Sequence, residues 1–189
     1  NWHALNEGNL GSVGTFAEMP NGDLIVGGNF TALDGVPVDN IARWNGTSWA
    51  SLGNSFPSPA MTVHCLTTLA NGDLLAGGFL FAGTTGSFIR GLARWQGTSW
   101  SPIGAGIGFV GGDSTVYAIQ EMPNGDLIVG GSFTQVDGVP MQHIARWNGA
   151  AWAAVGGGMN VAVRALALLP NGDLVAGGDF TQAGGNPAA

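Results

Sequence analysis

The ten-residue stretch NGDLIVGGNF, residues 21–30, occurs in four variants along this chain of 189 residues. The other copies are NGDLLAGGFL at 71–80, NGDLIVGGSF at 124–133 and NGDLVAGGDF at 171–180, so the copies start 50, 53 and 47 residues apart. A second phrase keeps the same spacing, as IARWNGTSW at 41–49, LARWQGTSW at 92–100 and IARWNGAAW at 144–152. A repeat of this length predicts an array of units that bury their apolar faces against one another.

Each unit is predicted to contain four short β-strands, which in the first copy are residues 15–20, 24–30, 41–44 and 47–53. Asn-Gly after the first strand predicts a hairpin, because both residues tolerate the positive φ of a type I′ turn. Residues 24–30 lack apolar–polar alternation, which predicts burial on both faces. Their paired glycines predict a bulge or the close approach of a neighbouring backbone. A polar loop is expected between the second and third strands.

Four antiparallel strands per unit predict an all-β fold of β-propeller blades, with a flat β-solenoid as the alternative. We expect a single propeller segment over residues 1–189, as part of a larger or oligomeric ring. Its predicted repeats are residues 1–8 (a terminal strand), 14–53, 61–104, 115–156 and 161–189 (incomplete).

The pattern NGDLxxGGxFT…DGxP…xIARWNGxxWxxLG resembles the propeller repeats of secreted and cell-surface bacterial proteins of the delta-60 type. It is also similar to the repeats of a fungal cortical bud-site marker and, more distantly, to kelch repeats. The resemblance covers essentially the whole chain. It implies a propeller fold and an extracellular or cell-surface location, and it leaves the ligand open.

The ends of the chain predict an incomplete ring. NWHALNEG at 1–8 aligns with the fourth strand of the other units, and the C-terminus follows a second strand. Three assemblies are compatible with this: a segment of a propeller of about six to eight blades, two copies in one ring, or copies stacked head to tail. The chain starts at Asn1 and shows no signal peptide, as expected of a processed or excised fragment.

Composition excludes several classes of function. The net charge is −7, the pI is about 4.5 and lysine is absent, so the surface repels phosphate backbones and nucleic-acid binding is not expected. No segment has the apolar length of a membrane span. The single cysteine, Cys65, precludes an intrachain disulfide and is predicted to be a small buried hydrophobe.

The residues that define the repeat are predicted to be structural. Each Asp after the Asn-Gly turn is expected to cap that turn or to pair with a repeat arginine. Four equivalent carboxylates do not offer the two different environments of an acid/base pair. The structural set is Asn21, Gly22, Asp23, Gly27, Gly28, Arg43, Trp44, Asn71, Gly72, Asp73, Gly77, Gly78, Arg94, Trp95, Asn124, Gly125, Asp126, Gly130, Gly131, Arg146, Trp147, Asn171, Gly172, Asp173, Gly177 and Gly178.

Candidate contacts to a ligand or partner are Trp49, Trp100 and Trp152, together with Asp34 and Asp137. Tryptophans in pairs predict packing between blades, and the alternative is a set of platforms that stack on sugars. The second Trp of each pair is expected to be the more exposed. The Asp-Gly dipeptides predict turns rather than calcium sites, because the spaced Asp series of a calcium loop is absent.

Catalytic, metal and cofactor sites are not predicted. His3, His64 and His143 lack metal-ligand spacing, and no nucleophile elbow is present. The predicted function is a non-catalytic, extracellular scaffold or assembly subunit that binds proteins or itself through open blade edges. The alternatives are a glycan-binding propeller and an enzyme. An enzyme site is expected on the irregular loops at 55–62 and 106–115, where the repeat departs from itself.

Overall fold

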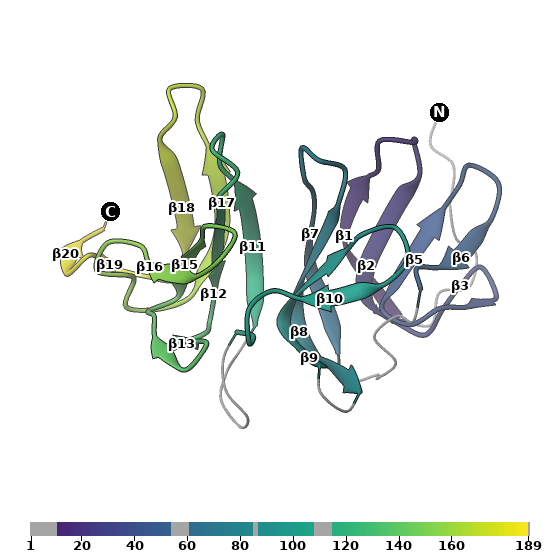
Figure 1. The fold of residues 1–189 in the computed structure, drawn as a ribbon, viewed down its shortest axis with the longest axis horizontal. Helices are drawn as coiled ribbons and strands as arrows, with labels where there is room; N and C mark the ends of the chain where they lie inside the picture. Colours follow the sequence, from purple (N-terminus) through teal and green to yellow (C-terminus); the bar gives the residue numbers. More distant parts are fainter. Residues whose placement is uncertain (1–10, 54–60, 85–86, 108–114, 189) are drawn as a thin grey trace.

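The computed structural model describes residues 11–53, 61–84, 87–107 and 115–188, and within these ranges the chain forms strands and no helix. Three four-stranded antiparallel sheets follow one another along the chain, and a two-stranded sheet comes after them. We call these sheets blades 1 to 4 (Figure 1). The predicted all-β fold with four-stranded antiparallel blades is confirmed. The terminal strand predicted at 1–8 lies outside the described residues.

Blades 1 to 3 share one strand order, in which each of the four main strands pairs with the next one along the chain. Blade 1 consists of β1 (Gly11–Glu18), β2 (Leu24–Phe30), β5 (Ile41–Trp44) and β6 (Trp49–Ser51). Blade 2 consists of β7 (Thr62–Thr68), β8 (Leu74–Thr84), β9 (Ser87–Trp95) and β10 (Trp100–Pro102). Blade 3 consists of β11 (Val116–Glu121), β12 (Leu127–Gly131), β15 (Ile144–Trp147) and β16 (Trp152–Ala154). Blade 4 contains β17 (Val163–Leu168) and β18 (Leu174–Gly178).

The blades are arranged side by side in an arc. The first strand of each blade contacts the first strand of the next, in the order β1, β7, β11, β17 (Figure 1). These four strands therefore line the inner side of the arc, where the axis of a propeller lies. The β17–β18 hairpin forms one end of the arc.

Small hairpins follow the second strands of blades 1, 3 and 4, where polar loops are predicted. They are β3 (Ala32–Leu33) with β4 (Val36–Pro37), β13 (Gln135–Val136) with β14 (Val139–Pro140), and β19 (Gln182–Ala183) with β20 (Asn186–Pro187). In the first of them Asp34 and Gly35 have φ of 50° and 74°, as a type I′ turn requires. A type I′ turn therefore forms at the Asp-Gly dipeptide of the small hairpin.

The turn at Asn-Gly differs from the predicted type I′ turn. Gly22 has a φ of 85°, whereas Asn21 is not among the residues with positive φ. The Gly22 N–H donates to the Met19 carbonyl (2.9 Å) and the Met19 N–H donates to the Asp23 carbonyl (2.9 Å). This is a three-residue loop with a type I turn closed by a left-handed glycine. Pro20 favours it, because its ring fixes the φ required at the second position of a type I turn.

The paired glycines satisfy both predictions made for them. Opposite the pair, β1 has a bulge, since Val13 pairs with Gly28 and Thr15 with Gly27. A Cβ on Gly28 would lie 2.1 Å from the carbonyl oxygen of Ser12, in the backbone of the paired strand. A Cβ on Gly27 would lie 2.5 Å from Cγ1 of Val63 in blade 2. Gly28 thus permits the bulge, and Gly27 permits the next blade to approach.

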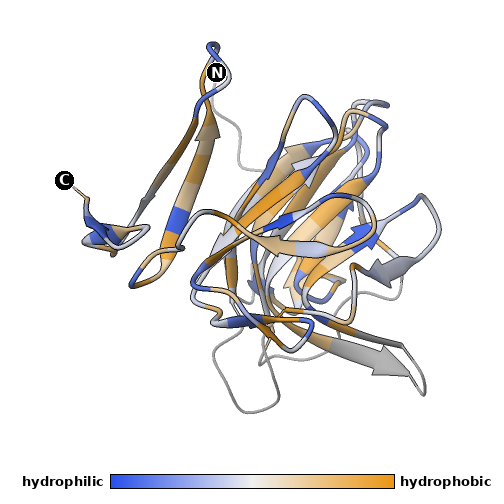
Figure 2. Ribbon diagram, turned by 60° about the vertical axis from the view of Figure 1, so that its left-hand side comes forward, coloured by the Kyte–Doolittle hydropathy of each residue, from blue (hydrophilic) through white to orange (hydrophobic). Residues whose placement is uncertain are grey.

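Apolar residues concentrate on the strands of the blades (Figure 2), and within the described ranges they form three buried clusters between neighbouring blades and one within blade 1. We call the side of a blade that packs on the following blade its front face, and the opposite side its rear face. Ile25 and Ile41 on the front face of blade 1 pack with Leu74 and Ala76 on the rear face of blade 2. Equivalent clusters lie between blades 2 and 3 and between blades 3 and 4. Burial on both faces, as predicted for the second strand, follows from this stacking.

Cys65 contributes to the core between blades 2 and 3, against which it packs. Its Sγ lies 3.9 Å from the carbonyl oxygen of Val116, and burial raises the pKa of the thiol to about 12. The thiol is therefore protonated at neutral pH and a poor nucleophile, in keeping with the predicted packing role.

Candidate functional site

Three of the four repeat aspartates, Asp23, Asp73 and Asp126, form ion pairs with repeat arginines, as predicted. The Asp73 Oδ2 accepts from Arg94 Nε at 2.7 Å and from Nη2 at 2.5 Å, and Asp126 is bound in the same way by Arg146. Arg43 Nε lies 3.3 Å from Asp23. Each of these carboxylates also accepts from the turn asparagine two residues before it. The pairs join the first hairpin turn to the third strand of the same blade.

Asp34 and Asp137 both occupy type I′ turns of the small hairpins. The Asp137 Oδ1 accepts from the N–H of Ala105 (2.7 Å), which ties the hairpin to the chain leaving blade 2. Among the described residues, no group of three or more His, Cys, Asp or Glu side chains is placed to hold a metal ion. The geometry at these two positions is that of turn residues.

The paired tryptophans contact each other within each blade. The ring centroids lie 5.2 Å apart for Trp44 and Trp49, 5.4 Å for Trp95 and Trp100, and 5.2 Å for Trp147 and Trp152. The Trp100 Nε1 donates to the carbonyl of Leu52 in the preceding blade at 2.9 Å. A Cβ on Gly53 would lie 2.5 Å from the Trp95 ring, so this indole covers a glycine of the preceding blade.

Exposure does not follow the predicted order within every pair. Trp100 is more exposed than Trp95, as expected, but in the first pair Trp49 is buried, with 7% exposure, and Trp44 is the more exposed partner. Trp49 is buried because it packs in a cluster with the small β3–β4 hairpin, which the sequence analysis had not anticipated.

The residue that each first strand extrudes at its bulge differs from blade to blade. The ladder skips one residue after the same valine in all four blades, namely Val13, Val63, Val116 and Val163. The skipped residues are Gly14, His64, Tyr117 and Arg164. A bulge turns its extra side chain away from the regular alternation of the strand, and bulges are common beside functional sites.

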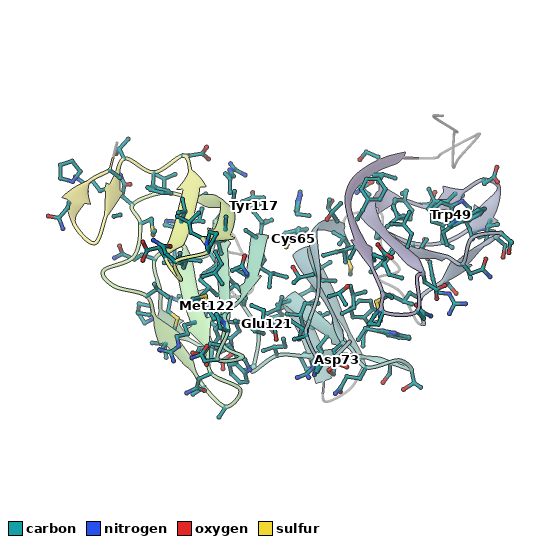
Figure 3. All side chains as sticks on the ribbon, turned by 90° about the horizontal axis from the view of Figure 1, so that it is seen from above. Trp49, Cys65, Asp73, Tyr117, Glu121 and Met122 are labelled. Carbon is teal, nitrogen blue, oxygen red and sulfur yellow. The ribbon has the colours of Figure 1, made fainter. Side chains whose placement is uncertain are left out.

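Three of these residues form a contiguous row on the inner side of the arc, which we call the axial row: His64, Tyr117 and Arg164. The rings of His64 and Tyr117 meet edge to face, with centroids 5.2 Å apart. The Arg164 guanidinium carbon lies 4.2 Å from the Tyr117 ring centroid, in cation–π geometry. Figure 3 shows Tyr117 at the middle of the arc, far from Trp49 in blade 1. The axial row links blades 2, 3 and 4.

Asp179, which follows β18, completes this cluster. Its Oδ2 accepts from Arg164 Nε at 2.9 Å and lies 2.8 Å from Nη2. The hydrogen bond to Asp179 is the main cause that raises the pKa of Arg164. Burial, and secondly the positive charge of Arg164, lower the pKa of His64. At neutral pH the row therefore contains a neutral imidazole, a phenol and a guanidinium.

The lowered pKa of His64 predicts a pH dependence of stability. Between the folded pKa and the ordinary value of 6.5, the unfolded chain binds more protons than the folded chain, so unfolding becomes easier as the pH falls through this window. We expect His64→Gln to remove this part of the slope, a few tenths of a kcal/mol after allowance for solvent screening. Urea unfolding at pH 5 to 7.5 measures it, and an unchanged slope would contradict the assignment.

Sequence reasoning did not identify the axial row. His64 was considered only as a metal ligand, and Tyr117 and Arg164 were not singled out. The other histidines do not join the row: His3 lies outside the described residues, and His143 lies in a loop with a φ of 66°, matching Asn40 at 61° in blade 1. The available signal was the position after the repeated valine, where the four copies carry four different residues. Most of the loops at 55–62 and 106–115 lies outside the described residues.

A second feature is the front face of blade 4, which lacks a following blade in the described structure. A Cβ on Gly77 would lie 2.8 Å from Val116 of the next blade, and one on Gly130 would lie 2.5 Å from Val163, but one on Gly177 would meet nothing within 4 Å. Val175 is 46% exposed, whereas Ile25 at the same position in blade 1 is fully buried.

The rear face of blade 1 also carries an exposed apolar side chain. Phe16 is 60% exposed, while its equivalents Leu66 and Ile119 are each 9% exposed, because those two residues pack on a preceding blade. The arc therefore presents apolar surface on the front face of blade 4 and at Phe16 on the rear face of blade 1.

Comparison with known proteins gives a family match in two segments. The profile of a β-propeller domain of unknown function (DUF5122) matches residues 20–46 and 123–148. Both segments run from the Pro-Asn-Gly turn to the strand IARW, in blades 1 and 3. A search of curated proteins found no match.

Solved structures share the arrangement of the blades. A catalytically inactive virginiamycin B lyase from Staphylococcus aureus, with quinupristin, is 15% identical with a TM-score of 0.51, over 89% of this chain and 52% of the lyase. PorZ, a surface component of the type-IX secretion system of Porphyromonas gingivalis, is 13% identical with a TM-score of 0.51, over 87% of this chain and 24% of PorZ. The fold is a β-propeller. The chain spans about half the length of the lyase it matches.

None of these matches is described as having delta-60 or kelch repeats. The resemblance to those repeats stays an expectation from the sequence. Within the described ranges, no helix is long and apolar enough to cross a membrane.

Proposed function

We propose that this chain is a non-catalytic, extracellular propeller segment, spanning residues 1–189, that serves as an assembly scaffold through the open front face of blade 4. The observation that supports this proposal is the contrast between Gly177 and its equivalents. Gly27, Gly77 and Gly130 each accept a valine of the next blade, while the same space in front of Gly177 is open. A face built like three occupied interfaces is suited to one further blade of the same kind.

The partner that fits this face is the rear face of blade 1 in a second copy of the chain. Between blades 3 and 4, the rear face supplies Val163, Leu166, Leu174 and Ala176. The residues of blade 1 at the same repeat positions are Val13, Phe16, Leu24 and Val26, which are all apolar. Phe16 is the exposed member of this set, whereas Val26 is buried in a cluster within blade 1. The contact would continue the interface that already joins the blades. Because it joins two different faces, it generates a closed ring or a growing stack.

Two further observations favour a scaffold. Glycan stacking needs exposed indole faces, whereas Trp49 is almost completely buried. The extracellular location rests on the resemblance of the repeat to those of secreted and surface proteins, and a protein of the same fold, PorZ, is a bacterial surface component. The lyase of this fold is an enzyme, so the fold by itself supports neither catalysis nor its absence.

Light scattering over a concentration series tests the proposal. We expect the molar mass to rise above 19.1 kDa with concentration, and Val175→Arg to return the chain to a monomer, because a buried unpaired charge is strongly unfavourable. Val139→Arg is the matched control, since Val139 is 53% exposed on a small hairpin away from this face. A monomer at all concentrations, or equal effects of both substitutions, would contradict the proposal.

A further inference from the structure

The axial row has no role in the packing that explains the rest of the repeat. The valine before the bulge in blades 2, 3 and 4 fills the space against the glycine of the preceding blade, as Val63 does at Gly27. The bulge residue itself varies between glycine, imidazole, phenol and guanidinium. A packing requirement common to the blades would select similar residues at this position, so the variation indicates that packing does not decide it.

Arg164 is held in an orientation suited to binding an oxyanion. The Tyr117 ring lies against its guanidinium group, with the guanidinium carbon 4.2 Å from the ring centroid. Arg164 also hydrogen-bonds the Tyr117 side chain, and its planar set of N–H donors matches carboxylate and phosphate oxygens. The side chain remains 49% exposed, so a solute can reach these donors.

Asp179 already demonstrates this binding within the chain. One carboxylate oxygen, Oδ2, contacts both Nε and Nη2 of Arg164, and the Asp179 side chain is 53% exposed. An ion pair this exposed stabilises a protein very little. An external oxyanion can therefore share Arg164 with Asp179, or displace Asp179 from Arg164, at little energetic cost.

His64 and Tyr117 supply further donors without adding negative charge. His64 is neutral at pH 7, because burial and Arg164 lower its pKa, and a neutral imidazole still carries one N–H. The other arginines of the repeat, Arg43, Arg94 and Arg146, are engaged with turn aspartates on their own blades. Arg164 is the arginine of the axial row.

We propose that His64, Tyr117 and Arg164 form a binding site, on the inner side of the arc, for a ligand that carries an oxyanion, either a carboxylate or a phosphate. Arg164 is the main anion contact, Tyr117 orients it, and His64 extends the donor surface to blade 2. The site is separate from the front face of blade 4, and it does not depend on assembly.

Tyr117 makes the test direct, because it is the only tyrosine in the sequence. Selective ¹³C labelling of tyrosine gives the ring signals of one residue, next to Arg164. The labelled full chain is titrated with inorganic phosphate and, separately, with acetate, and sodium chloride at matched ionic strength is the reference. We expect a saturable shift of the Tyr117 signals with one or both oxyanions. Saturation by phosphate alone assigns a phosphate ligand, and saturation by acetate alone assigns a carboxylate.

Three variants separate binding from structure. Arg164→Gln is expected to weaken the oxyanion response about tenfold or more, since charge-assisted hydrogen bonds are lost. Arg164→Lys keeps the charge but loses the planar fork, and an intermediate affinity is expected. Asp179→Asn removes the internal competitor and is expected to tighten binding about two- to fivefold. A structural role for the ion pair would not produce that gain.

The proposal is overturned if neither oxyanion gives a saturable shift, if chloride gives the same shift, or if the response persists in Arg164→Gln. It is also overturned if Asp179→Asn weakens binding while the chain remains folded. Thermal unfolding of each variant checks the fold, and a folded Arg164→Lys keeps the test valid if Arg164→Gln does not fold.

Discussion

Gly78→Ala is expected to destabilise the chain by about 3–5 kcal/mol, at the upper end of effects seen for single substitutions. A Cβ at this position would lie 2.0 Å from the carbonyl oxygen of Thr62, which belongs to the backbone of the paired strand β7. To relieve this clash, the bulge at His64 would have to open and the hydrogen-bonded ladder would have to shift. The free energy of unfolding from urea titration, followed by tryptophan fluorescence, measures the loss.

Gly177→Ala is the matched control for this prediction. Gly177 also lies in a second strand, but a Cβ there would meet nothing within 4 Å. We expect a change of at most about 0.5 kcal/mol in the unfolding free energy of the monomer, because the alanine that replaces glycine has room there. Equal losses for Gly78→Ala and Gly177→Ala would show that strand conformation, rather than the close approach, requires these glycines.

The close approach at these glycines could be predicted from the sequence because packing acts on every copy alike. Glycines inside a strand are unfavourable, so their recurrence at 27–28, 77–78, 130–131 and 177–178 indicated a contact that excludes a side chain. The same reasoning predicted the Asp–Arg pairs, since both residues recur with fixed spacing. Features required by the stacking of blades are repeated in the sequence and are therefore visible in it.

Turn geometry was predicted less well, because local preferences compete. Asn-Gly favours a type I′ turn in isolation, but Pro20 and the hydrogen bonds of Met19 produce a three-residue loop with positive φ at glycine alone. Asp34-Gly35 has the same local preference and does adopt type I′, since its hairpin has a two-residue loop. The length of the loop, which strand register sets, decides between the two turns.

The axial row and the open face could not be derived from the repeat alone. Averaging the four copies retains what they share and discards the bulge position, where Gly14, His64, Tyr117 and Arg164 differ. Recognising that position required the strand register, which shows that one residue is skipped in each first strand. Val175 is exposed because it lies on the front face of blade 4, although the same repeat position is buried in blade 1. The repeat sequence alone does not distinguish these two positions.

Asp126→Ala is expected to destabilise the chain by about 2 kcal/mol, the range for a lost hydrogen bond to a charged group. The Asp126 carboxylate is largely buried and accepts from Asn124 Nδ2 at 2.7 Å and from Arg146 Nε at 2.6 Å. The substitution leaves a turn amide and a half-exposed guanidinium without this acceptor, and the guanidinium recovers part of the loss from water. Urea unfolding at pH 7 measures the change.

Asp173→Ala tests which part of this loss comes from Arg146 and burial. Asp173 makes the same turn contacts, with Asn171 Nδ2 at 2.7 Å and its own N–H donating to Asn171 Oδ1 at 3.1 Å, but it is exposed. We expect Asp173→Ala to cost about 0.5 kcal/mol, as is usual for surface positions. If the two substitutions cost the same, the carboxylate acts only within the turn, and the Arg146 pair contributes nothing measurable to the blade. A larger cost for Asp126→Ala assigns the difference to its burial and to the link between the turn and the third strand.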